Sequence, residues 1–170
     1  MNRNTVYYIV ICLLFIGLKF WFKSFDNDEL NFLLKPTSWL FGIISGEQSI
    51  YSIETGYYYQ NLNIVINKTC SGYNYLVLCF VMISFQIASY LKTIKFKILS
   101  VLVCFTVSYI LTVLINTSRI LISVLVLRIN HNLINLYHKV VHEWVGIITY
   151  LSFLIIIYCF IEKIKKRYYA

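Results

Sequence analysis

Long apolar runs separated by short polar segments dominate the pattern of the chain. The four longest runs cover residues 6–22, 73–91, 98–115 and 144–161. Each run is close to the roughly 20 apolar residues that a helix needs to cross a bilayer. We therefore predict a mainly α-helical, polytopic membrane helix bundle with about four full spans and some shorter helices.

The segment between the first two runs, residues 23–72, is more polar. Residues 29–45 are amphipathic and contain the only proline, Pro36, which predicts a pair of short interfacial helices. Residues 46–69 hold two strand-like stretches around a turn, and NLNIVIN alternates polar and apolar residues. We predict a small β-hairpin, which must lie in water or against protein because hydrocarbon cannot satisfy open strand edges.

A fifth apolar run, residues 120–128, is too short to span a bilayer. The polar motif NTSR, residues 116–119, precedes it, and a polar segment that contains all three histidines, residues 129–143, follows it. We predict that residues 117–129 form a half-helix that returns to the same face or a helix buried among its neighbours. The sequence leaves a full span over these residues open as well.

The composition is typical of a membrane protein, and the positions of the basic residues explain the positive net charge. The chain is 59% hydrophobic and 13% charged, whereas soluble domains are about 45–50% apolar and about 25% charged. A net charge of +8 can indicate nucleic-acid binding, but the lysines and arginines gather at the ends of apolar runs. We therefore expect one integral membrane domain over residues 1–170, surrounded by lipid, with no nucleic-acid partner.

The basic segments predict the orientation in the membrane. The two densest are KTIKFK, residues 92–97, and EKIKKR, residues 162–167. The positive-inside rule places both on the cytoplasmic side, which requires an even number of crossings between them. Residues 23–72 and 116–143 then lie on the outer face of a plasma (cytoplasmic) membrane.

The stretch NKTCSG, residues 67–72, places Cys70 directly before the second apolar run, whereas the other four cysteines lie inside apolar runs. A thiolate is the reactive form of cysteine, and a helix beginning near Ser71 would favour it through its positive N-terminal end. Gly72 gives the backbone freedom beside the thiol. The same residues also fit a simple strand-to-helix turn with Ser71 as the cap.

Arg119 follows one apolar run and precedes another. A charge between membrane segments is costly unless it is paired or hydrated, which makes Arg119 a functional candidate. A snorkelling arginine at the interface has the same pattern. Its guanidinium could hold a substrate carboxylate or stabilise an oxyanion, and Asn116, one helical turn earlier, could share that task.

The three histidines, His131, His138 and His142, are spaced as one stripe of a helix. That spacing permits a metal site and a metal-dependent hydrolase, but HEWVG departs from the HExxH pattern of zinc proteases. We predict no metal and no cofactor. His142 opens the last apolar run, and Gly146, one turn later, allows another backbone to approach closely.

The motifs C-S-G before a membrane helix, N-x-x-R at the end of another and H-x-x-x-G at the start of the last occur in that order. This order resembles the exosortase/archaeosortase family of membrane cysteine transpeptidases, and the short length is similar to the exosortase K type. The resemblance covers roughly residues 60–160. It implies that Cys70 is the nucleophile and that Arg119 and His142 complete the catalytic site, with His138 as the competitor of His142.

The resemblance also implies a substrate and a reaction. Members of the family act on exported proteins that end in a short sorting motif, a membrane helix and a basic tail. Cleavage of this C-terminal sorting signal would proceed through a thioester, and the new C-terminus would pass to an acceptor, a lipid or a glycan. The alternative is a non-catalytic polytopic membrane scaffold or assembly protein, in which Arg119 and the histidines are packing polar groups.

Overall fold

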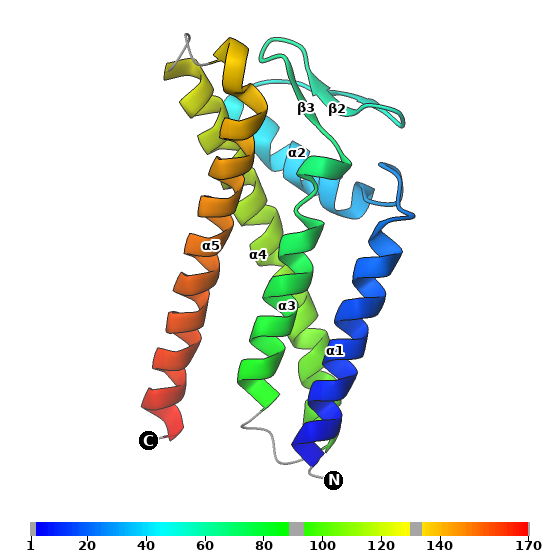
Figure 1. Cartoon of the computed structure of the whole chain (residues 1–170), viewed down its shortest axis with the longest axis vertical. Helices are drawn as coiled ribbons and strands as arrows, with labels where there is room; N and C mark the ends of the chain where they lie inside the picture. The colour runs from blue at the N-terminus through cyan, green and yellow to red at the C-terminus, as the bar shows by residue number, and fades with distance from the viewer. Residues whose placement is uncertain (1–2, 89–93, 130–133, 170) are drawn as a thin grey trace. The chain divides into compact units, whose positions relative to one another are not determined.

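A computed structural model describes residues 3–88, 94–129 and 134–169 of the chain (Figure 1). This described part is mostly helical, as predicted, and also contains a small antiparallel sheet. Its elements in chain order are α1 (Arg3–Phe22), α2 (Asn31–Ser45), β1 (Ile50–Ser52), β2 (Gly56–Tyr59), β3 (Ile64–Ile66), the 3₁₀ turn η1 (Lys68–Cys70), α3 (Tyr73–Ala88), α4 (Ile94–Ile129) and α5 (Ile134–Tyr169).

The elements divide into two compact units. Unit 1 comprises Met1–Ser24, Tyr73–Thr112 and Leu154–Ala170, and unit 2 comprises Phe25–Gly72 and Val113–Phe153. Helices α4 and α5 each contribute one part to each unit. The single integral membrane domain over residues 1–170 stays a prediction.

Three helical segments are long and apolar enough to cross a membrane, by length and composition, within the described ranges. They are Lys68–Ile87, Phe96–Val126 and His142–Arg167. Many apolar side chains of α4 and α5, such as Leu102 and Ile155, are more than half exposed, as lipid-facing residues are. Helix α1 carries a shorter apolar stretch, so the fourth predicted span stays a prediction.

In unit 1, α1 packs along α3 through aromatic and apolar side chains. Ile11 of α1 is fully buried, and the ring of Tyr8 meets Phe85 of α3 edge to face at 5.3 Å between centroids. At the other end of the pair, Phe22 stacks on Tyr73 at 4.6 Å. Aromatic pairs at both ends therefore fix how these two helices align.

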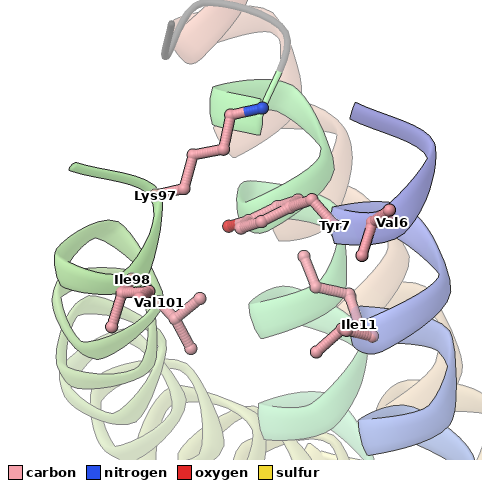
Figure 2. A pocket seen from close by; sticks show the side chains of 7 residues that line it. Val6, Tyr7, Ile11, Lys97, Ile98 and Val101 are labelled. Carbon is pink, nitrogen blue, oxygen red and sulfur yellow. The ribbon is translucent and has the colours of Figure 1, made fainter. Parts of the chain in front are cut away.

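Unit 1 also holds an apolar cavity of about 300 Å³ between α1 and α4 (Figure 2). Lys97 enters its wall from α4, and its ammonium nitrogen lies 5.8 Å from the ring centroid of Tyr7. The other lining residues are Val6, Val10, Ile11, Ile98 and Val101. This lining is almost entirely apolar, with Lys97 and Tyr7 as its polar members.

In unit 2, residues 31–45 form one continuous helix, α2, and the predicted pair of short helices broken at Pro36 is wrong. Proline removes one backbone hydrogen bond of a helix, normally at a cost in stability. One face of α2 is nevertheless buried on both sides of the proline, with Leu33 and Leu34 before it and Thr37 and Phe41 after it. This packing keeps the helix continuous because most helical stability comes from tertiary contacts.

The predicted two-stranded hairpin is also wrong in one respect, because the sheet has three antiparallel strands in the order β1-β2-β3. The second predicted strand divides at a turn in which Asn63 adopts a left-handed φ of 50°. The alternation of NLNIVIN is confirmed within β3, where Ile66 is buried and Val65 is exposed. Strand β2 rests on α2 (Figure 1), with the rings of Tyr59 and Phe41 edge to face at 4.9 Å.

Helix α4 continues straight through NTSR, and residues 117–129 are its last turns, not a returning half-helix. The hydroxyl side chains of this stretch bond back to the helix itself. Thr117 Oγ1 donates to the carbonyl of Val113 at 2.8 Å, and Ser118 Oγ donates to that of Leu114 at 3.0 Å. A helix of 36 residues is about 54 Å long, longer than the roughly 30 Å of a hydrocarbon core.

Candidate active site

Unit 2 gathers polar side chains from three segments that are far apart in the chain. Cys70 comes from η1, Asn116 and Arg119 come from α4, and His142 and Tyr150 come from α5. Asn116 is fully buried, and Arg119 and Cys70 are 7% and 8% exposed. Buried polar groups of this kind need partners, so their hydrogen bonds define the site.

Cys70 ends the 3₁₀ turn η1, and its neighbours hold that turn in place. Asn67 caps the turn by accepting the backbone N–H of Thr69 on its side-chain oxygen at 3.1 Å. The N–H of Cys70 donates to the carbonyl of Asn67 at 2.8 Å. Helix α3 begins at Tyr73, two residues after the expected start near Ser71, so Cys70 precedes the helix by three residues and belongs to its own turn.

The thiol of Cys70 faces an imidazole. Its Sγ lies 3.8 Å from Nε2 of His142, a distance at which a thiol can donate to a neutral ring nitrogen. The hydroxyl oxygen of Thr69 also lies 3.8 Å from Sγ. The Thr69 hydroxyl, however, donates its proton to Asn67 Oδ1 at 2.7 Å. His142 Nε2 is therefore within hydrogen-bonding reach of the Cys70 thiol.

The backbone of Cys70 is held from α4. Asn116 Nδ2 donates to the carbonyl oxygen of Cys70 at 2.6 Å. Gly72 allows this approach, because its φ is +74° and a Cβ there would lie 3.0 Å from Cγ of Asn116. Glycine supplies both the left-handed conformation and the space that the asparagine side chain occupies.

Arg119 is a buried cation that retains hydrogen-bonding capacity. Its Nη1 donates to the hydroxyl of Tyr150 at 3.1 Å, whereas its Nε has no hydrogen-bond partner among the described residues. No described carboxylate lies within ion-pair distance of it. Gly146 makes room for the guanidinium, because a Cβ at that position would lie 2.7 Å from Nε. An unsatisfied buried donor on a cation is costly in stability, which is typical of a functional site.

Most of the predicted site residues therefore lie in one unit. Ser71 is buried directly beside Cys70, and the network joins the predicted residues Cys70, Gly72, Asn116, Arg119, His142 and Gly146. The side chains of His131 and His138 lie outside the described residues. The choice between His138 and His142 therefore stays a prediction. Among the side chains that are described, no three of the His, Cys, Asp and Glu type are grouped to hold a metal ion.

Sequence reasoning missed Tyr150, whose hydroxyl joins Arg119 to Asn116. It donates to Asn116 Oδ1 at 2.7 Å while it accepts from Arg119. The helical spacing offered a signal, because Tyr150 follows His142 and Gly146 at i+8 and i+4 on one stripe of α5.

Comparison of the chain with models of protein families, with curated proteins and with solved structures finds no match.

Proposed function

We propose that this chain is a membrane-embedded cysteine protease or transpeptidase that cleaves a C-terminal sorting signal of exported proteins. The observation that carries the proposal is the approach of Cys70 Sγ to His142 Nε2 at 3.8 Å in a buried site. A thiol beside an imidazole is the arrangement that nucleophilic cysteine catalysis uses. The ordered C-S-G, N-x-x-R and H-x-x-x-G motifs, which resemble the exosortase/archaeosortase family, suggest the substrate.

In the first half of the reaction, His142 takes the thiol proton and Cys70 Sγ attacks the scissile carbonyl carbon. The tetrahedral intermediate collapses, the C–N bond breaks, and the imidazolium of His142 donates its proton to the leaving amine. The released fragment is the membrane helix and basic tail of the substrate. The retained protein remains joined to Cys70 as a thioester.

In the second half, an acceptor nucleophile replaces the amine. His142 removes the proton of the acceptor hydroxyl or amine as it attacks the thioester carbonyl. Collapse of the second tetrahedral intermediate breaks the C–S bond, and the thiolate recovers its proton from the imidazolium. We propose a lipid or a glycan as the acceptor, and water as the acceptor in simple hydrolysis.

Arg119 is proposed to stabilise the oxyanion of both tetrahedral intermediates. Its Nε is a buried charged donor without a described partner, so it can bond an oxygen that appears only during the reaction. Donors that are already oriented in a site without bulk water stabilise such charge strongly. The buried position also removes competition from water for the guanidinium.

The apolar helices and the basic segments support a proposal for the location. Three segments are long enough to cross a membrane, and the basic run of residues 162–167 closes the last of them. With that run on the cytoplasmic side, we propose a multi-pass plasma membrane protein whose site opens on the outer side. The site would then meet exported substrates after they have crossed the membrane.

The test is a processing assay with Cys70→Ala. The reporter is a tagged protein from the same genome that ends in a short motif, an apolar helix and a basic tail. The wild-type chain should shorten it, Cys70→Ala should not, and Cys159→Ala should process normally because Cys159 is exposed on α5. Processing by Cys70→Ala at the normal rate contradicts the proposal.

An alkylation measurement separates the enzyme from the scaffold alternative. A membrane-impermeant maleimide added from outside should label Cys70 in intact cells and label the Cys70→Ala variant much less. If Cys70 is inert and no reporter is shortened, the scaffold function is the better one.

A further inference from the structure

Three residues at successive turns of α5 face the same cluster. His142 approaches the thiol of Cys70, Gly146 leaves the space that Arg119 fills, and Tyr150 bonds both Arg119 and Asn116. His142 is the base of the proposed reaction and Gly146 leaves space for Arg119, whereas the proposed reaction assigns no step to Tyr150. Its position between two site residues requires its own explanation.

The chemistry of the side chains fixes the direction of the hydrogen bonds around Tyr150. A guanidinium only donates, so the phenol oxygen must accept from Arg119 Nη1. The single phenol proton is then left for Asn116 Oδ1, at 2.7 Å. With its oxygen engaged, the amide of Asn116 turns its NH₂ group to the carbonyl oxygen of Cys70, at 2.6 Å.

The reverse orientation of Asn116 is unfavourable in this setting. A flipped amide would place its oxygen against the carbonyl oxygen of Cys70 and its NH₂ group against the Tyr150 hydroxyl. Two acceptors would then face each other in a buried site, where an unmade hydrogen bond costs most. The direction set by Arg119 through Tyr150 therefore decides which end of Asn116 meets the nucleophile's backbone.

We propose that Tyr150 is a positioning residue, which holds the guanidinium of Arg119 and the amide of Asn116 in fixed positions relative to Cys70. The inference rests on the proposed function, in which Arg119 meets the oxyanion and Cys70 attacks. The Tyr150 hydroxyl anchors one end of the guanidinium through Nη1, and Nε, which has no hydrogen-bond partner among the described residues, is the donor that we assign to the oxyanion. The ring adds a second constraint, since Cζ of Arg119 lies 5.1 Å from its centroid, within the range of a cation–π contact.

Tyr150→Phe is the sharp variant because it removes the hydroxyl and retains the ring. We expect kcat for reporter processing to fall about 10- to 100-fold, with KM nearly unchanged because Tyr150 does not touch the substrate. The matched control is Tyr158→Phe, two turns along α5 at an exposed position, which should process at the wild-type rate. Asn116→Ala should lower kcat as well, and the double variant should lose little more, because both changes break one chain of hydrogen bonds.

A second readout needs no substrate. The ratio of Cys70 alkylation rates by anionic iodoacetate and neutral iodoacetamide reports a cation beside the thiol. Arg119→Gln should lower that ratio, and Tyr150→Phe should move it toward the Arg119→Gln value. If Tyr150→Phe leaves both kcat and the ratio at wild-type values, the positioning role is overturned while the enzyme stands. If Cys70→Ala still processes the reporter, the proposed function fails, and the alkylation ratio decides the role of Tyr150.

Discussion

Sγ of Cys70 lies 3.8 Å from Nε2 of His142, although 72 residues separate them in the sequence. The cysteine belongs to a short 3₁₀ turn that a side-chain cap fixes, and the histidine belongs to a 36-residue helix. Both residues lie on regular backbone elements, which can hold a thiol and an imidazole at the short distance that proton transfer needs.

His142→Gln tests this pair. Glutamine is of similar size but cannot accept and return a proton, so we expect kcat for reporter processing to fall by about 100-fold or more. Membrane levels of the protein should stay at the wild-type value. The measurement is the initial rate of reporter shortening in isolated membranes, with expression followed by immunoblot.

His138→Gln is the control for His142→Gln, since the sequence places both histidines on one stripe. We expect this variant to process at a rate close to that of the wild type. A large loss in His138→Gln together with normal processing in His142→Gln would assign the base to His138.

Hydropathy predicted most of the helices, but it could not predict how far one of them continues. The polar motif NTSR reads as an interruption of an apolar run, yet α4 extends through it to Ile129. Thr117 and Ser118 bond to the carbonyls one turn earlier, so their hydroxyls are satisfied inside the helix. A hydropathy pattern scores Thr117 and Ser118 as polar because it takes no account of the hydrogen bonds that their hydroxyls make to the helix backbone.

The members of the candidate site could be picked from the sequence where a residue contrasts with its surroundings. Cys70, Arg119 and His142 are chemically conspicuous beside apolar runs, and the structure brings Asn116 into the same cluster. Tyr150 lacked that contrast, since it is one of 15 tyrosines and stands in an apolar run where an aromatic residue is ordinary. Its role appears only when the neighbouring helix supplies Arg119 and Asn116 as partners.

Gly146→Ala should damage the site through Arg119. A Cβ at Gly146 would lie 2.7 Å from Nε of Arg119, so the guanidinium must move away from its present position. We expect kcat to fall about tenfold or more, the loss that corresponds to roughly 1.4 kcal/mol of transition-state stabilisation. The rate of reporter processing is the measurement.

The control for this change is Gly17→Ala in α1, where nothing lies within 4 Å of an added Cβ. Alanine is the better helix former by about 1 kcal/mol, so Gly17→Ala should retain activity and stability. Equal activity of both variants would show that the space at Gly146 has no part in holding Arg119.

Gly72→Ala and Gly46→Ala form a matched pair that separates backbone strain from a side-chain clash. Both glycines have nearly the same left-handed φ, +74° and +73°, but only Gly72 faces a neighbour, Asn116, at 3.0 Å from an added Cβ. The strain of about 1–2 kcal/mol is common to both variants. We expect the melting temperature of the purified protein to fall in both, and reporter processing to be lost mainly in Gly72→Ala. Equal loss of activity in the two variants would show that the contact with Asn116 is not the cause of the loss.

Tyr59→Phe should weaken unit 2 without touching the site. The hydroxyl of Tyr59 is buried and donates to the carbonyl of Ser38 at 2.6 Å, with the Ser38 hydroxyl 2.7 Å away. Its removal leaves buried groups of α2 without their partner, at a cost of about 1–3 kcal/mol in the free energy of unfolding. The control is Tyr58→Phe, whose hydroxyl makes an exposed bond to Asn63 and should matter little. Thermal unfolding in detergent compares the two, and a Tyr59→Phe protein as stable as Tyr58→Phe would mean that this bond does not tie the sheet to α2.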